Sequence, residues 1–108
     1  MNKIKRRLCL GKPIYKVFTL NMFDIEKGKF CSELFGWYKQ QKHACNVVKN
    51  NVFDMQDGGL FNYAVVVRSY QGAYALNDEI IQWYRWNYTI GEWEMCECPK
   101  SCNNLMFI

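Results

Sequence analysis

The sequence holds little of what enzymes commonly use for catalysis. Its 108 residues include one histidine, His43, and no glycine-rich motif of the kind that cradles phosphate groups. A Cys-His nucleophilic pair needs side chains that converge, yet His43 and Cys45 are close neighbours on a predicted helix and diverge by about 200°. Asp54 and Asp57 flank a Gly-Gly turn without further ligands at metal-binding spacing. We therefore expect no catalytic residue, no enzymatic activity and no cofactor.

The six cysteines lack the Cys-x-x-Cys spacing of common zinc sites. Cys96 and Cys98 alternate along a predicted strand, and Cys102 follows shortly after, so three thiolates stand near one another in the sequence. A further zinc ligand would be His43, Cys31 or Cys45. Ligands spread along a strand lack the tight turn that gathers thiolates, which favours reduced cysteines that pack against their neighbours. We predict that the protein binds no metal.

No apolar run is long enough and free enough of charge to span a membrane, although half of the residues are hydrophobic and 17% are aromatic. The same composition excludes a disordered chain. The length corresponds to a single domain over residues 1–108. Near the amino terminus, Gly11, Lys12 and Pro13 interrupt the apolar run that begins at Leu8. We therefore expect no signal peptide, a cytoplasmic location and reduced cysteines.

Positive charge is concentrated at the amino end, whereas the net charge of +4 is mild. The basic residues there are Lys3, Lys5, Arg6, Arg7, Lys12 and Lys16. Residues 1–13 therefore form a basic arm that suits an acidic partner, either nucleic acid or an acidic protein surface. The alternative is a solvated terminus without a partner.

Alternating apolar residues and glycine spacing predict the secondary structure. Strands are expected at residues 14–20, 33–38, 61–70, 79–88 and 93–98, with a short last strand at 105–108. Residues 39–51 change to a helical period, because Ala44, Val47 and Val48 recur on one helix face, and Asn50-Asn51 ends the helix. Residues 22–29 suit a turn or a short helix. This order predicts an α+β fold in which an antiparallel sheet of roughly four to six strands carries one main helix on a face.

The stretch from Phe61 to Cys98 should be the core, as three consecutive antiparallel strands. A two-residue turn at Ile90-Gly91 would pair Tyr88 with Trp93 and Trp86 with Met95. On that register one face holds Tyr84, Trp86, Tyr88, Trp93 and Met95. The other face holds Ile81, Trp83, Arg85, Asn87, Glu94, Cys96 and Cys98. One face covers the helix-packed core, and the aromatic residues of the other either form a binding surface or thicken a thin core.

Several segments carry a resemblance to a known class of proteins. They are Phe35-Gly-Trp-Tyr, Phe61-Asn-Tyr-Ala-Val-Val-Val, Gly72-Ala-Tyr, Ile81-Gln-Trp-Tyr-Arg-Trp-Asn and Cys98-Pro. With the predicted helix, they resemble small uncharacterised accessory proteins of bacteriophages and prophages in low-GC bacteria. The resemblance covers residues 33–108 and brings no active site. It implies a short viral protein in the cytoplasm of a bacterial host, a class rich in inhibitors of defence systems such as CRISPR effectors.

The first function to consider is therefore a non-enzymatic phage protein that blocks a host defence component by stoichiometric binding. Such inhibition needs a complementary shape and a few aromatic anchors, without catalytic residues. The contact surface would be the aromatic hairpin, or the loops around Gly58-Gly59 and Gly72.

Two alternatives involve nucleotides. In the first, the protein is a sponge for a small nucleotide signalling ligand, with a tryptophan stacked on the base and an arginine facing the phosphate. In the second, the basic arm binds nucleic acid and an exposed aromatic face stacks against its bases. The candidate binding residues for all three functions are Trp83, Arg85, Trp86, Arg68, Tyr88 and Trp93.

Overall fold

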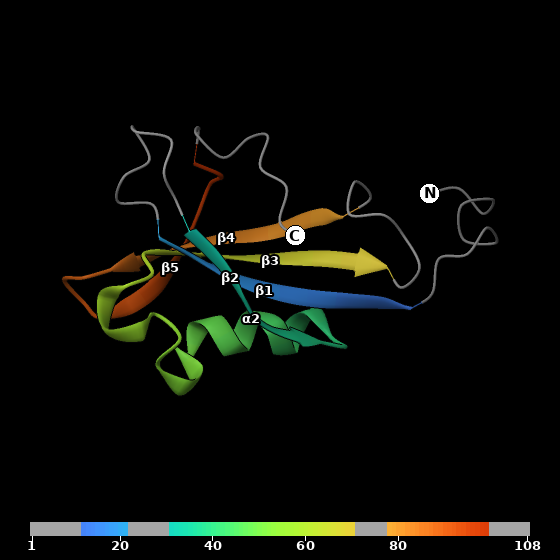
Figure 1. Ribbon diagram of the computed structural model, residues 1–108, viewed down its shortest axis with the longest axis horizontal. Coiled ribbons are helices and arrows are strands. Elements are labelled where there is room, and N and C mark those ends of the chain that lie inside the picture. Colours follow the sequence, from blue (N-terminus) through green and yellow to red (C-terminus); the bar gives the residue numbers. More distant parts are fainter. Residues whose placement is uncertain (1–11, 22–30, 71–77, 100–108) are drawn as a thin grey trace.

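The chain folds as an antiparallel sheet with an α-helix against it, in the part that the computed structural model describes, residues 12–21, 31–70 and 78–99. The strands are β1 (Pro13–Asn21), β2 (Cys31–Tyr38), β3 (Tyr63–Tyr70), β4 (Glu79–Asn87) and β5 (Glu92–Cys96). The helix α2 spans Gln41–Lys49, and two 3-10 turns follow it, η2 (Val52–Asp54) and η3 (Asp57–Gly59). The 5-stranded sheet has the order β2-β1-β3-β4-β5 (Figure 1). The predicted α+β architecture is confirmed.

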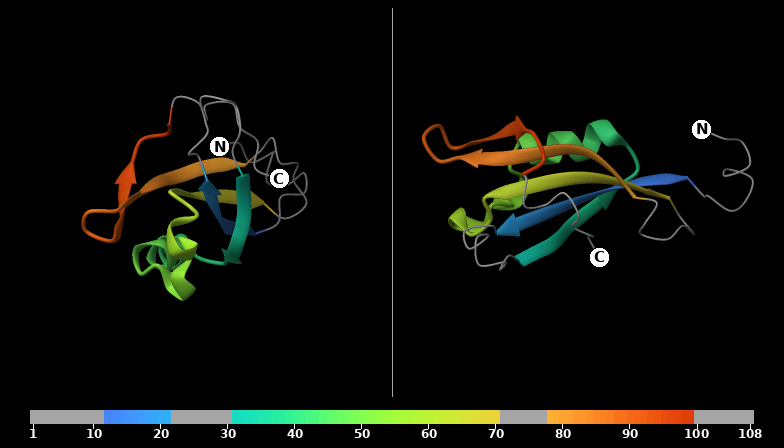
Figure 2. Two further views of the ribbon diagram at one scale, coloured as in Figure 1. Left: turned by 60° about the vertical axis from the view of Figure 1, so that its left-hand side comes forward. Right: turned by 90° about the horizontal axis from the view of Figure 1, so that it is seen from above.

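The strand order places β3 at the centre of the sheet, with β1 next to it inside the sheet. β3, β4 and β5 are consecutive antiparallel neighbours, so the predicted three-stranded core is present. β1 lies between β2 and β3 and pairs with each of them in the antiparallel sense. Figure 2 shows β2 and β5 at the two edges of the twisted sheet.

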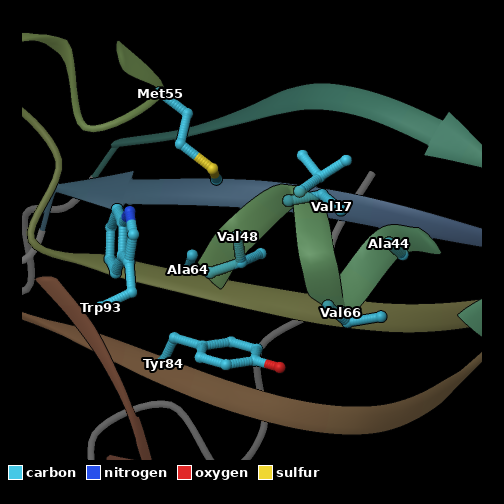
Figure 3. Packing of buried hydrophobic residues seen from close by; sticks show 9 residues of the cluster. Val17, Ala44, Val48, Met55, Ala64, Val66, Tyr84 and Trp93 are labelled. Carbon is cyan, nitrogen blue, oxygen red and sulfur yellow. The ribbon is translucent and has the colours of Figure 1, made fainter. Parts of the chain in front are cut away.

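The helix α2 covers one face of the sheet. Its buried residues are Ala44, Val47 and Val48, as their spacing predicts. It ends at Lys49, and Asn51 takes a left-handed backbone conformation with φ of 45°, in agreement with the predicted asparagine stop. The residues that meet the helix are Val17, Ala64, Val66, Tyr84 and Trp93 of the sheet and Met55 of the following loop (Figure 3).

The opposite face of the sheet is also buried. Its core residues are Phe18, Leu20, Val65, Val67 and Trp83. Trp83 is 3% exposed and meets Tyr63 edge to face, with 6.4 Å between the ring centroids. Trp83 therefore thickens the core of this face and does not form an exposed aromatic surface.

The β4–β5 hairpin differs from the predicted register by two residues. Its last pair is Asn87 with Glu92, so the loop holds residues 88–91 and not Ile90-Gly91 alone. The Asn87 side-chain oxygen accepts hydrogen bonds from the N–H groups of Thr89 and Ile90, at 2.9 and 3.2 Å. The Gly91 N–H donates to the Asn87 carbonyl at 2.8 Å. The predicted two-residue turn was wrong because these bonds stabilise a longer one.

The register shift changes which residues stand opposite each other. Trp86 faces Trp93 instead of Met95, and Met95 faces Tyr84. Tyr88 lies in the turn and has no partner in the β4–β5 ladder. A shift by two residues does not exchange the two faces of a strand, so Trp86 and Trp93 share one face, as predicted. That face is the helix side.

Two bulges redirect side chains. A register shift in the β3–β4 pairing leaves Ile81 of β4 without a partner in β3. The alternation predicted that Ile81 shares a face with Trp83, but Ile81 packs on the helix side instead. In β2 the extra residue is Phe35, beside Gly36, and a glycine inside a strand is typical of such a bulge. A Cβ at Gly36 would lie 2.9 Å from the Tyr38 hydroxyl oxygen, so the close neighbour of this glycine is a side chain and not backbone.

Some predictions fall outside the described residues. They concern residues 22–29, the Gly72 loop, Cys102, the 105–108 strand and residues 1–11 of the basic arm. Within the described ranges, no helix has the length and the hydropathy needed to cross a membrane.

Candidate binding surfaces

The aromatic candidate residues do not share one surface. Trp93 is buried on the helix side, where its Nε1–H donates to the Asn51 side-chain oxygen at 3.1 Å. Trp86 is partly buried beside it, edge to face, with 5.3 Å between the ring centroids. Trp83 lies in the core of the other face. Tyr88 is the aromatic candidate that the structure leaves exposed.

The arginines expected to face a phosphate are each paired with a carboxylate. Arg68 forms an ion pair with Glu79 across β3 and β4, and this hydrogen bond is the main reason why the pKa of Arg68 is raised. Arg85 Nη2 lies 3.6 Å from Glu94 Oε2 across β4 and β5. Each positive charge is therefore partly offset by a neighbouring carboxylate in this conformation.

The sheet separates Cys96 and Cys98 from Cys45, the candidate zinc ligands whose cysteine side chains the structure describes. Cys96 and Cys98 pack on the face opposite to α2, whereas Cys45 packs on the helix side. Burial raises the pKa of the Cys96 thiol and so disfavours the thiolate that zinc binds. His43 is exposed on α2, with its ring centroid 4.7 Å from that of Tyr38. Among the described residues, no group of 3 or more His, Cys, Asp or Glu side chains is placed to hold a metal.

The loop between α2 and β3 is held in shape by its own side chains. The Asn51 oxygen that accepts the tryptophan N–H also accepts the Gln56 backbone N–H, at 3.2 Å. The Asp54 carboxylate accepts from Asn51 Nδ2 at 3.3 Å, from Gln56 Nε2 at 3.2 Å and from the Gly58 N–H at 3.2 Å. Met55 is buried in the helix-side core and anchors the loop. This network gives an irregular segment one defined conformation.

Phe53 stands out within this loop. Its backbone has φ of 53° and ψ of 31°, the left-handed region in which a Cβ crowds the carbonyl oxygen. Asn51, Asp54 and Asp57 also have positive φ, but asparagine and aspartate tolerate that conformation better than phenylalanine. The Phe53 side chain is 92% exposed, so its ring adds little to the core. Stability explains neither the backbone strain nor the exposed ring.

Three more apolar side chains are exposed at the same end of the molecule. Tyr88 and Ile90 of the β4–β5 turn are 57% and 56% exposed, and Leu60 after η3 is 48% exposed. The Tyr88 hydroxyl donates to the Gly59 carbonyl at 3.2 Å, which joins the turn to the loop. Figure 1 shows the loop and the turn together at the left-hand end of the sheet. We call Phe53, Leu60, Tyr88 and Ile90 the end patch.

Three exposed carboxylates accompany the end patch. Asp54 follows Phe53 in the loop, Asp57 begins η3, and Glu92 begins β5 directly after the turn. An apolar surface with acidic neighbours is complementary to a protein surface whose apolar pocket is bordered by lysine or arginine.

A second candidate surface lies where β1 begins and β2 ends. A pocket of about 560 Å³ is lined by Lys12, Pro13, Ile14, Trp37 and Lys39. Trp37 is 57% exposed and stands opposite Lys16 in the β1–β2 pairing. None of the lining residues that the structure describes is acidic, so the described part of the pocket joins an aromatic surface to positive charge.

Comparisons of the chain with protein-family models, with curated proteins and with solved structures give no match. The two candidate surfaces are therefore described from their own residues.

Sequence analysis missed Phe53, Leu60 and Trp37 as candidates. Phe53 and Leu60 carry a usable signal, because they are apolar residues in a stretch otherwise rich in asparagine, aspartate and glycine. The face of the sheet on which the Trp37 side chain lies depends on the bulge at Phe35, because the bulge interrupts the alternation of side chains along β2. A regular strand would have placed Leu34 and Trp37 on opposite faces.

Proposed function

We propose that this protein is a non-enzymatic binding protein of the bacteriophage accessory class that its sequence resembles. It inhibits a host antiviral defence protein by stoichiometric binding through the end patch. The observation that carries the proposal is Phe53, an exposed aromatic ring held on a strained backbone. Strained residues persist where a function keeps them, and exposed aromatic side chains are typical anchors of protein interfaces.

The end patch suits binding because its shape is fixed before the partner arrives. Backbone N–H groups of the loop donate hydrogen bonds to the side-chain oxygens of Asn51 and Asp54, and together with the buried Met55 these bonds hold the loop. The bond from Tyr88 to Gly59 holds the neighbouring turn against it. A preformed surface loses less conformational entropy on association, so more of the contact energy appears as affinity.

The partner is a protein surface with an apolar pocket for Phe53 and a border of lysine or arginine. Asp54, Asp57 and Glu92 would attract such a surface over several ångströms of solvent. Association should therefore slow as salt is added, while dissociation depends mainly on the apolar anchors.

The test begins with capture of the defence protein from extracts of the low-GC bacterial host. The captured protein is purified, and its activity is titrated with the phage protein. We expect activity to fall linearly to an end point near equivalence once both concentrations exceed the dissociation constant. Complete inhibition at a small fraction of equivalence, progressing with time, would show turnover and overturn the proposal.

Matched variants test whether the end patch is the surface that contacts the partner. Leu60→Asn and Ile90→Asn remove apolar side chains of the end patch and should each weaken inhibition about tenfold or more. Leu34→Asn makes the same kind of change at an exposed leucine of β2 and should leave inhibition unchanged. Equal loss in all three variants, or in Leu34→Asn alone, would move the contact away from the end patch.

A further inference from the structure

We propose that the pocket beside Trp37 is a second binding site, and that it takes a nucleoside phosphate. The site is distinct from the end patch, because it is built on the start of β1 and the end of β2. It uses none of Trp83, Trp86, Arg68 and Arg85, the residues expected from sequence to hold a nucleotide, and it shares Lys12 with the basic arm.

The apolar part of the pocket fits a planar base. Trp37 offers an exposed indole, and Pro13 and Ile14 form compact apolar walls beside it. A volume of about 560 Å³ lies within the usual range of small-molecule sites. Stacking on an indole is open to every base, since each has an aromatic face.

The charged part of the pocket fits a phosphate. Lys12 and Lys39 line it, and Lys16 stands opposite Trp37 on the neighbouring strand. Residues directly opposite in an antiparallel pair share a face, so Lys16 adds its charge to the same side of the sheet. The ion pairs among the described residues are Arg68–Glu79 and Arg85–Glu94, and they leave these lysines uncompensated.

The combination of an indole with lysines selects the ligand class. An acidic peptide would pair with Lys12 and Lys39 but would not need the indole of Trp37. An apolar ligand would cover the indole but bury ammonium groups without partners, which is costly. A nucleoside phosphate meets both requirements, whether it is free or part of a single strand.

The experiment follows the side-chain indole N–H signals of the full-length protein by nuclear magnetic resonance. The signal of Trp37 is assigned with Trp37→Phe, and the probes are adenosine monophosphate, adenosine, inorganic phosphate and a short adenine single strand. We expect adenosine monophosphate to shift the Trp37 signal in a saturable way, and adenosine or phosphate alone to bind much more weakly. The adenine single strand shows whether the natural ligand is a nucleic-acid strand or a free nucleotide. If the strand binds each site more tightly than the monophosphate does, the ligand is a strand. Equal binding indicates the free nucleotide.

Variants test the assigned residues. Trp37→Ala should weaken binding of the monophosphate about tenfold or more. Lys12→Gln and Lys39→Gln should each weaken it severalfold, whereas Lys49→Gln on α2 removes the same charge elsewhere and should have no effect. The lysine variants decide the question if Trp37→Ala does not fold.

Four results would overturn the proposal. The first is no shift of the Trp37 signal with any probe. The second is equal binding of adenosine and its monophosphate. The third is binding of inorganic phosphate as tight as that of the monophosphate, which would leave an anion site without base stacking. The fourth is binding that survives Trp37→Ala or responds equally to Lys12→Gln and Lys49→Gln, which would place the ligand elsewhere.

Discussion

Replacing Phe53 by asparagine should stabilise the protein and weaken its partner binding at the same time. A left-handed backbone costs roughly 1–2 kcal/mol for a residue with a Cβ, and asparagine recovers part of that cost through local hydrogen bonding. The Phe53 ring is 92% exposed, so its removal sacrifices little buried apolar surface. We therefore expect the free energy of unfolding to rise by about 1 kcal/mol.

Two further substitutions at Phe53 separate backbone strain from loss of the ring. Phe53→Ala removes the ring but keeps the Cβ, so the strain remains and stability should change by less than about 0.5 kcal/mol. Phe53→Gly removes the strain but also makes the unfolded chain more flexible, so its gain should be smaller than that of asparagine. Urea denaturation followed by tryptophan fluorescence measures all three, with the midpoint shifting at unchanged slope.

The order of the variants is the decisive result. If Phe53→Asn is no more stable than Phe53→Ala, the left-handed backbone stores no strain and the reasoning fails. All three variants should lose partner binding, because all remove the aromatic anchor. A variant that binds as tightly as the parent would leave Phe53 without a role in the interface.

Three other outcomes follow from the structure. Burial and a hydrogen bond with Cys45 raise the pKa of Tyr84 above its ordinary value of 10.0, so the folded state holds the phenolic proton more tightly than the unfolded state. This contribution to stability is complete below about pH 10 and declines above it, and Tyr84→Phe should flatten the decline in urea melts at increasing pH. Asn87→Ala should lower the free energy of unfolding by about 1–2 kcal/mol, because the turn N–H groups of Thr89 and Ile90 lose their acceptor, with Thr89→Ala as a near-neutral control. Elemental analysis should find no stoichiometric zinc; zinc that disappears on replacing Cys96 and Cys98 by serine would contradict the metal-free prediction.

The spacing of the apolar residues predicted most helices and strands correctly, because it indicates which side chains are buried on folding. Ala44, Val47 and Val48 repeat on one helix face, and the structure buries all three. The hairpin register was harder, because it depends on one side chain. The extra hydrogen bonds of Asn87 favour a turn that is longer than the Ile90-Gly91 pair indicates.

The binding residues were less predictable than the fold. Aromatic density drew attention to Trp83 and Trp93, but aromatic residues serve cores and interfaces equally well. Which role applies depends on whether that part of a face is covered, and here each face of the sheet holds a buried cluster that includes one of these two tryptophans. Trp37 became a candidate through the bulge at Phe35, which no period in the sequence records.

The Asn51 side chain couples the unfolding of the loop between α2 and β3 to the detachment of β5. One oxygen atom accepts the Gln56 N–H within the loop and the Trp93 Nε1–H from the sheet. Opening the loop therefore breaks a contact of the core, and detaching β5 releases the loop. The amide hydrogens of a loop coupled in this way should exchange with solvent at a rate similar to those of β5. An ordinary surface loop would exchange its amide hydrogens much faster. The exposed ring of Phe53, on its strained backbone, therefore belongs to a segment that should unfold together with β5 at the sheet edge.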